Sequence, residues 1–156
     1  MSESIVTFLA SFLIWVLFFG ILILWLVDGR IKKEVALHAI LATVLAWTVA
    51  EMIKSFLPSI RPFNINGLTP LTLTVPIGGA FPSGHTASAF AASTSIFLHK
   101  KGLGLIFLLG ALGVGMGRVL SNVHFPLDIV GGGFLGILSA ILIKRTHFFG
   151  LLKKKK

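Results

Sequence analysis

The chain has 156 residues, of which 55% are hydrophobic and 12% are charged. This composition excludes a disordered chain and argues against an ordinary soluble domain, where about 25% of residues are charged; it is typical of an integral membrane protein. The formal charge of +9 does not indicate a nucleic-acid partner, because the basic residues form short blocks between apolar runs. Cysteine is absent, which excludes disulfides, zinc thiolates and cysteine nucleophiles.

The first predicted element is a membrane span over Ile5–Val27. No charged residue lies between Glu3 and Asp28, and a helix of this length extends about 34 Å, enough to cross a bilayer. A signal peptide is the alternative, but it needs a positively charged leader and a shorter apolar core. Because the segment is rich in Phe, Leu, Ile and Trp, we expect a true span at the lipid-facing periphery.

Four more apolar stretches follow and are predicted to cross the membrane: Val35–Leu57, Ser83–Leu98, Leu103–Leu120 and Pro126–Ile143. The last three are near the lower length limit for a span, so their ends should lie at headgroup depth. The segment Asn64–Ala80 is predicted to be a polar loop without helix, because Gly and Pro interrupt it. The predicted fold is all-α: one polytopic transmembrane bundle over residues 1–156, with about five spans, a motif-bearing core at about 50–145 and a peripheral first span at 5–27.

Small residues recur at helical spacing in the later spans, where they would let helix backbones approach closely. They are Ala87, Ala91 and Ser95, then Gly113 and Gly117, then Gly132 and Gly136.

The distribution of Lys and Arg predicts the orientation. With five spans, one side of the membrane receives 11 of the 14 basic residues, including the tail Lys153–Lys156 as an anchor. We therefore expect the N-terminus outside and the C-terminus in the cytoplasm of a cell-membrane protein. Only Lys54, Arg61 and Arg118 lie on the outer side.

Those three cations mark the candidate site. Pro82-Ser83-Gly84-His85 opens the third span, and His124 and Asp128 flank the start of the fifth. Two crossings separate His85 from His124, so both return to the outer face. The topology therefore predicts one cluster, which needs an anion to neutralise it: Lys54, Arg61, His85, Arg118, His124 and Asp128.

Local sequence refines this cluster. Ser83 is a good N-cap, and Gly84 allows close approach, so the third span would present free N–H groups to an anion. His124 and Asp128 are four residues apart and would share one helix face after the Pro126 turn. The carboxylate would hold one ring nitrogen and leave the other as a nucleophile or base.

Three motifs together resemble the signatures of the type 2 phosphatidic acid phosphatase superfamily. They are Lys54-x6-Arg61-Pro62, Pro82-Ser83-Gly84-His85 and Arg118-x5-His124-x3-Asp128, and they cover about half of the chain. Two features depart from the family pattern: Gly117 stands where the family usually has Ser, and five spans are recognisable where membrane members usually have six.

The resemblance implies a catalytic mechanism. His124 would attack phosphorus and form a phosphohistidine, Asp128 would orient His124, and His85 would protonate the leaving oxygen and then help to activate water. The phosphoryl oxygens would be held by Lys54, Arg61, Arg118 and the amides of Ser83 and Gly84. Independently of the resemblance, the spacing of three residues favours an ion pair of Glu51 with Lys54 or another basic residue, with substrate handling as the alternative. Glu51 and Pro62 are therefore expected to support the site. No metal or cofactor is expected.

The expected function is hydrolysis of a lipid phosphate or diphosphate at the outer leaflet. Candidate substrates are undecaprenyl or another polyprenyl diphosphate, phosphatidylglycerophosphate and phosphatidic acid, with no obligate protein partner. The alternatives are a phosphotransferase with the same intermediate, a non-catalytic lipid-phosphate binder or transporter, and a membrane scaffold or pore. No role is assigned to His38, His99 or His147.

Overall fold

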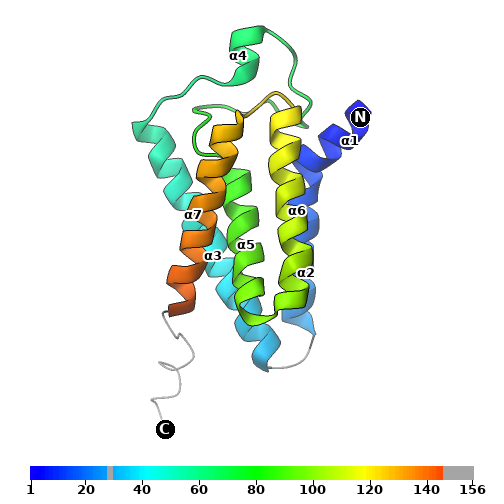
Figure 1. Cartoon of the computed structure of the whole chain (residues 1–156), viewed down its shortest axis with the longest axis vertical. Helices are drawn as coiled ribbons and strands as arrows, with labels where there is room; N and C mark the ends of the chain where they lie inside the picture. Colours follow the sequence, from blue (N-terminus) through cyan, green and yellow to red (C-terminus); the bar gives the residue numbers. More distant parts are fainter. Residues whose placement is uncertain (28–29, 146–156) are drawn as a thin grey trace.

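A computed structural model describes residues 1–27 and 30–145, without the side chains of 30–32, and these residues form helices and no strand. The predicted all-α fold is confirmed (Figure 1). His147 and the Lys153–Lys156 tail lie outside the described residues. The first helix consists of α1 (Glu3–Thr7), a π-helical turn η1 (Phe8–Phe12) and α2 (Leu13–Leu26). The others are α3 (Arg30–Phe56), α4 (Pro62–Asn66), α5 (Gly84–His99), α6 (Lys101–Leu120) and α7 (Pro126–Arg145).

Four segments are long and apolar enough to cross a membrane: Glu3–Leu26, Lys33–Phe56, Lys101–Leu120 and Pro126–Arg145. The prediction of three short helices holds for α5, with 16 residues, and is wrong for α6 and α7, with 20 each. Lys and Arg are good helix formers, so α6 and α7 extend through the charged residues that flank their apolar stretches. Figure 1 shows the start of α5 lower in the bundle than the end of α6 and the start of α7.

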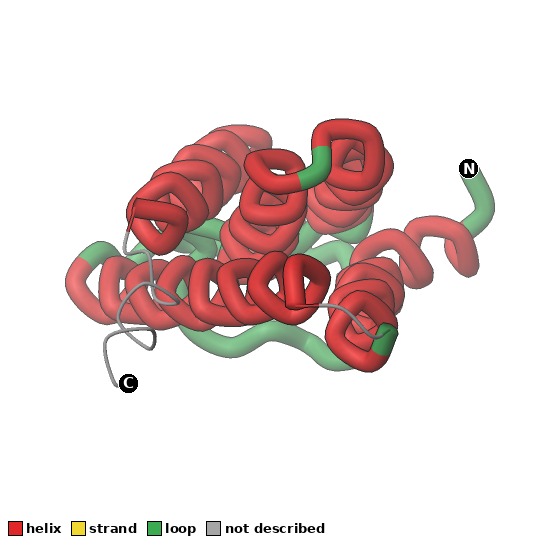
Figure 2. The backbone as a smooth tube through the Cα atoms, turned by 90° about the horizontal axis from the view of Figure 1, so that it is seen from below, coloured by secondary structure: helices red, strands yellow, loops and turns green. Residues whose placement is uncertain are grey.

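The short helix α5 occupies the centre of the bundle and packs against α3, α6 and α7. Figure 2 shows α3 running obliquely across the bundle. The predicted close packing of small residues is confirmed: a Cβ atom at Gly136 of α7 would lie 2.4 Å from the carbonyl oxygen of Ala87 in α5. At Gly132, it would lie 2.5 Å from the carbonyl oxygen of Ser83. These glycines let the backbones of α5 and α7 touch.

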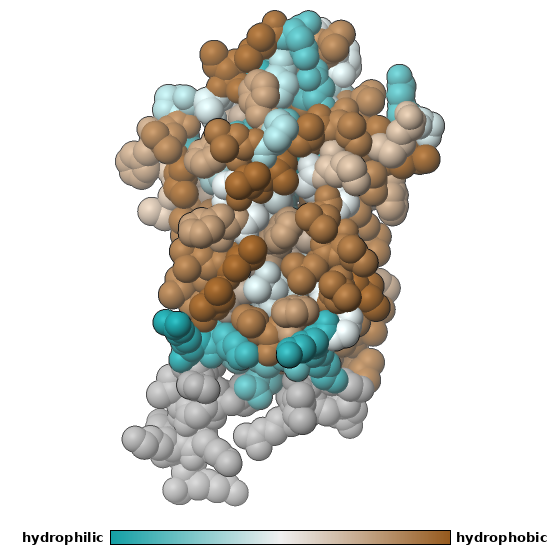
Figure 3. Space-filling model, viewed as in Figure 1, coloured by the Kyte–Doolittle hydropathy of each residue, from teal (hydrophilic) through white to brown (hydrophobic). Residues whose placement is uncertain are grey.

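The face of the bundle seen in Figure 3 is apolar between its two ends. Large hydrophobic side chains such as Trp15, Val44, Leu109 and Phe134 are more than half exposed, as expected for a multi-pass membrane protein. The N-terminus and the segment between α3 and α5 lie at one end of the bundle, here called the loop end (Figure 1). At the other end α5 and α7 end and α6 begins (Figure 1). This end carries Lys100, Lys101, Lys144 and Arg145 and is here called the lysine end.

The segment Asn64–Ala80 differs from its prediction in two ways. Its first residues belong to α4, because Pro62 stands at the first helical position, where its fixed φ favours a helix. The segment also exposes apolar side chains, including Leu73 at 68% and Ile77 at 96%, so the description as a polar loop is wrong. The prediction relied on the Gly and Pro content of the whole segment. It therefore overlooked the helix-starting Pro62 and the individual apolar residues of the loop.

Candidate active site

The loop end brings the predicted site residues together from five segments. Lys54 lies in the last turn of α3 and Arg61 precedes α4. Ser83 caps α5, whose first residues are Gly84 and His85. Arg118 lies in the last turn of α6, His124 follows it, and Asp128 lies in the first turn of α7.

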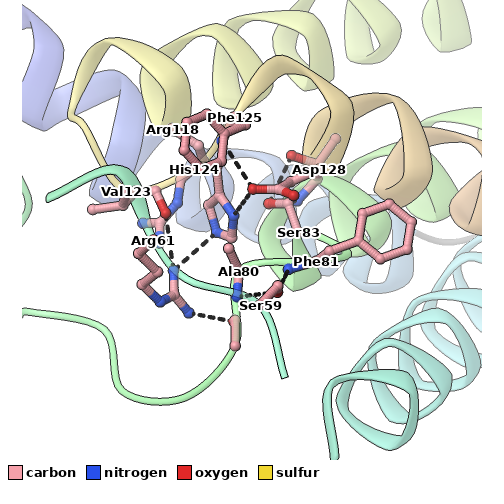
Figure 4. A network of polar contacts seen from close by, with 12 residues as sticks. Ser59, Arg61, Ala80, Phe81, Ser83, Arg118, Val123, His124, Phe125 and Asp128 are labelled. Carbon is pink, nitrogen blue, oxygen red and sulfur yellow. Dashed lines mark hydrogen bonds and ion pairs between the residues drawn. The ribbon is translucent and has the colours of Figure 1, made fainter. Parts of the chain in front are cut away.

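His124 and Asp128 form a buried pair (Figure 4). His124 Nδ1 lies 3.3 Å from Asp128 Oδ2, and the same oxygen accepts a hydrogen bond of 2.8 Å from the Phe125 amide at the start of α7. A carboxylate only accepts hydrogen bonds, so Nδ1 of the neutral ring carries the proton and Nε2 carries a lone pair. The helix start therefore fixes both the position of the carboxylate and the tautomer of His124.

The pKa of His124 is lowered to about 4. Burial is the largest cause, and the positive charges of Arg118 and Arg61 act in the same direction, while the hydrogen bond to Asp128 opposes them. The imidazole is thus neutral at pH 7, which is the form that can act as a nucleophile.

Arg61 reaches the unprotonated nitrogen of this histidine. Its Nη1 lies 3.4 Å from His124 Nε2 and 3.1 Å from the carbonyl oxygen of Val123. Its Nε and Nη2 donate to the carbonyl oxygens of Gly78 and Gly79, both at 2.9 Å. The guanidinium is therefore held by backbone on two sides, with only 3% of the residue exposed.

Ser59 fixes the loop segment around Arg61. Its hydroxyl oxygen accepts hydrogen bonds from the amides of Ala80 at 2.9 Å and Phe81 at 2.7 Å (Figure 4). The sequence analysis missed Ser59, because a serine before an Arg-Pro pair carries no pattern of its own. The sequence could not identify the carbonyl groups of Gly78 and Gly79 as partners of Arg61 either, because every residue has a carbonyl group.

Arg118 is anchored to the first helix. Its Nη1 donates to the carbonyl oxygen of Ala10 in η1 at 3.1 Å, and its buried Nε has no hydrogen-bond partner among the described residues. The neighbouring Gly117 explains the departure from the family's Ser: a Cβ atom there would lie 2.6 Å from the backbone nitrogen of Ala10. The first helix thus packs directly on α6 and supplies a carbonyl group that positions a site cation.

Lys54 and Glu51 form the ion pair that the sequence favoured, with Nζ and Oε1 2.6 Å apart. This pair lies beside the start of α5, because a Cβ atom at Gly84 would come within 3.1 Å of that carboxylate and 3.4 Å of that ammonium. Glycine therefore leaves room at the point where the lysine approaches the helix N-terminus.

Ser83 forms the expected N-cap, and its hydroxyl oxygen accepts hydrogen bonds from the amide and the hydroxyl of Thr86. Its own amide, expected to bind phosphate, instead donates to the carbonyl oxygen of Asp128 at 3.0 Å. That bond joins the starts of α5 and α7. The donors that remain for a ligand here are the Ser83 hydroxyl and the Gly84 amide.

His85 borders an apolar cavity of about 300 Å³ between α2, α3 and α5, whose lining includes Trp15 and Trp47. A second cavity of about 440 Å³ adjoins it and shares Phe18, Thr43 and Val44. The two cavities together are here called the apolar groove. Because Trp15, Val44 and Trp47 in its lining are each more than half exposed, the groove opens on the lipid-facing side of the bundle. His85 also lies within electrostatic range of His124 and of the three cations.

Together these groups form a cluster of cations around a neutral imidazole, an arrangement suited to a phosphoryl group and to attack on its phosphorus. Both carboxylates of the site have basic partners: Asp128 is paired with His124 and Glu51 with Lys54.

The chain is similar to several known proteins. The family model of the PAP2 superfamily matches residues 35–150. The bacitracin transport permease protein BcrC of Bacillus licheniformis is 33% identical over 147 residues, covering 92% of this chain and 70% of that protein. An undecaprenyl-diphosphatase of Sulfolobus acidocaldarius is 27% identical over 123 residues, covering 78% and 60%. The crystal structure of Aquifex aeolicus LpxE superimposes with a TM-score of 0.70 at 30% identity, covering 84% and 77%.

Proposed function

The chain belongs to the PAP2 superfamily, and on that premise we propose that it is a membrane phosphatase that hydrolyses a lipid phosphate or diphosphate through a phosphohistidine at His124. The observation that carries this proposal is the orientation of one ring: Asp128 holds Nδ1–H, and Nε2 faces the guanidinium of Arg61. Binding an anion requires the cations alone, whereas a neutral histidine with a fixed tautomer is what a nucleophile needs.

The proposed reaction has two steps. His124 Nε2 attacks phosphorus, the bond from phosphorus to the leaving oxygen breaks, and His85 donates the proton that this oxygen takes up. His85 then accepts a proton from water, whose oxygen attacks the phosphohistidine and releases inorganic phosphate. The carboxylate of Asp128 balances the charge on the His124 ring in the intermediate.

Binding of the phosphoryl group requires one rearrangement. The Arg61 N–H that faces Nε2 turns to a phosphoryl oxygen, which frees the lone pair for attack. Other oxygens accept from Arg118, Lys54, the Ser83 hydroxyl and the Gly84 amide. This preorganised positive charge stabilises the transition state without a metal ion.

The groove beside His85 supports a lipid substrate. It is apolar, opens on the side of the bundle and continues from the site toward Trp25. A hydrocarbon chain lying there would keep its tail at membrane depth while its phosphate reaches the cluster of cations. Since one similar protein is named undecaprenyl-diphosphatase, we rank polyprenyl diphosphates first, ahead of phosphatidylglycerophosphate and phosphatidic acid.

The proposed location is the cell membrane, with five spans and the site on the extracytoplasmic side. The exposed basic residues of the lysine end support this orientation through the positive-inside rule. The absence of cysteine allows a direct test. In intact cells, a membrane-impermeant maleimide should label Ile77→Cys at the loop end and should not label Lys101→Cys at the lysine end. The reverse labelling pattern would contradict the proposed orientation.

The activity is tested by phosphate release from purified protein in detergent with excess EDTA. Undecaprenyl diphosphate, phosphatidylglycerophosphate and phosphatidic acid are offered separately, with the His124→Ala variant in parallel. Release that persists in EDTA and falls at least about 10³-fold in the variant supports the proposal. No release by folded protein favours a lipid-phosphate binder, and release that requires an added alcohol acceptor favours a phosphotransferase.

A further inference from the structure

Two histidines without an assigned role meet at the lysine end of the bundle. His38 on α3 and His99, the last residue of α5, place Nδ1 and Nε2 3.0 Å apart, with ring centroids separated by 5.0 Å. His38 is 3% exposed, and His99 is half-buried. At ~1.5 Å per residue, His38 lies about 24 Å along α3 from Lys54, so this pair belongs to a different region from the phosphatase site.

The backbone sets the tautomer of His99. Its Nδ1 lies 2.8 Å from the carbonyl oxygen of Ser95, one turn earlier on α5. A carbonyl group only accepts, so Nδ1 carries the proton and Nε2 of the neutral ring presents a lone pair toward α3. A histidine that donates one N–H to a backbone carbonyl while the other nitrogen is held ready is the usual arrangement of a metal ligand.

Glu34 completes a three-residue set. It precedes His38 by one turn of α3, which places both side chains on the same helix face. Ligand atoms of Glu34, His38 and His99 all lie within 4.8 Å of one another. Two imidazoles and one carboxylate match the protein ligands of many zinc sites, whose fourth position is taken by water.

We propose that Glu34, His38 and His99 bind a Zn²⁺ ion that connects α3 to α5 at the lysine end. Binding requires the two ring nitrogens to turn from each other toward a shared ion about 2.0–2.1 Å away. His38 and Glu34 come from one helix and His99 from another. The ion therefore acts as a structural link between the oblique helix and the central helix.

The first test measures binding by the full chain without an affinity tag. Protein stripped with EDTA and desalted is titrated with ZnCl₂ against a chromophoric chelator. We expect one ion per chain and at least a tenfold loss of affinity in His99→Gln and in His38→Gln. The matched control is His85→Gln, which removes a histidine from the other end and should leave Zn²⁺ affinity unchanged.

The second test needs no variant and remains informative if the histidine variants fold poorly. Co²⁺ bound to the unaltered protein should give the intense visible absorption of a four-coordinate site. X-ray absorption of the zinc protein should show two imidazole ligands. Zn²⁺ should also raise the melting temperature of the unaltered chain and not that of Glu34→Gln.

Three results would overturn the proposal. They are the absence of stoichiometric Zn²⁺ binding, an affinity that His38→Gln and His99→Gln leave unchanged, and a coordination shell without two imidazoles. In each case the two rings would form only a hydrogen bond between α3 and α5.

Discussion

Basic residues at the two ends of the bundle have opposite environments. At the loop end, Arg61 and Arg118 are 3% and 4% exposed and donate to backbone carbonyl groups. At the lysine end, Lys101, Lys144 and Arg145 are exposed. An exposed charge keeps its hydration, whereas a buried one requires polar partners. The lysine end therefore carries charges that suit topology, and the loop end carries charges that suit a bound anion.

Asp128 is the acid that orients His124 at the loop end, and its carboxylate can be replaced by an amide of the same shape. Asp128→Asn replaces an acceptor with an amide that can donate to His124 Nδ1, so the ring would carry its proton on Nε2 and lose its nucleophile. We expect phosphate release to fall by about 10²–10⁴-fold. Initial rates with the preferred lipid check this, and a variant within twofold of the parent would contradict the assigned tautomer.

The same substitution can be made at both ends. Arg61→Lys keeps the positive charge but loses the planar group that spans His124 and the carbonyl groups of Gly78 and Gly79. We expect kcat/KM to fall by about 10–100-fold. Arg145→Lys, on an exposed helix end, should stay within twofold. If both substitutions changed kcat/KM equally, the buried Arg61 would have no greater role in catalysis than the exposed Arg145, which would contradict the comparison.

Glycines on α6 offer a matched pair for stability. Gly117→Ser introduces the family's residue, but its Cβ would lie 2.6 Å from the backbone of η1, and we expect a loss of about 1–3 kcal/mol. Gly102→Ser meets open space, so it should change stability by less than about 0.5 kcal/mol. Thermal unfolding in detergent measures both. A Gly117→Ser protein as stable as the parent would show that the first helix does not pack directly on α6.

The burial of His124 also predicts how the stability of the chain depends on pH. The pKa of His124 is about 4 in the folded chain and 6.5 in the unfolded one, so the unfolded state binds more protons between these values. This contribution to stability is complete above pH 6.5 and is lost as pH falls through about 4. Between pH 6.5 and 4.5, the melting temperature of the parent should fall a few degrees more than that of His124→Asn. Parallel curves would contradict a buried neutral imidazole.

The sequence predicted the helical fold, the close packing of Gly132 and Gly136 and the N-cap at Ser83, because periodicity, small residues and capping groups are local signals. Charge distribution also identified the cations of the loop end. It did not reveal Ser59, the carbonyl group of Ala10 or the use of the Ser83 amide by Asp128. Those contacts depend on which backbone groups meet in space. The pairing of His38 with His99, 61 residues apart, was hidden for the same reason.

The proposed reaction at the loop end requires that His124 becomes covalently phosphorylated. Protein mixed with a lipid substrate labelled at the terminal phosphate should be quenched in alkali within milliseconds and analysed by mass spectrometry. We predict an acid-labile, alkali-stable phosphoryl group on His124 that is absent from His124→Ala and disappears as phosphate is released. Rapid turnover without any phosphoprotein, or a phosphoryl group on another residue, would contradict this account of the loop end.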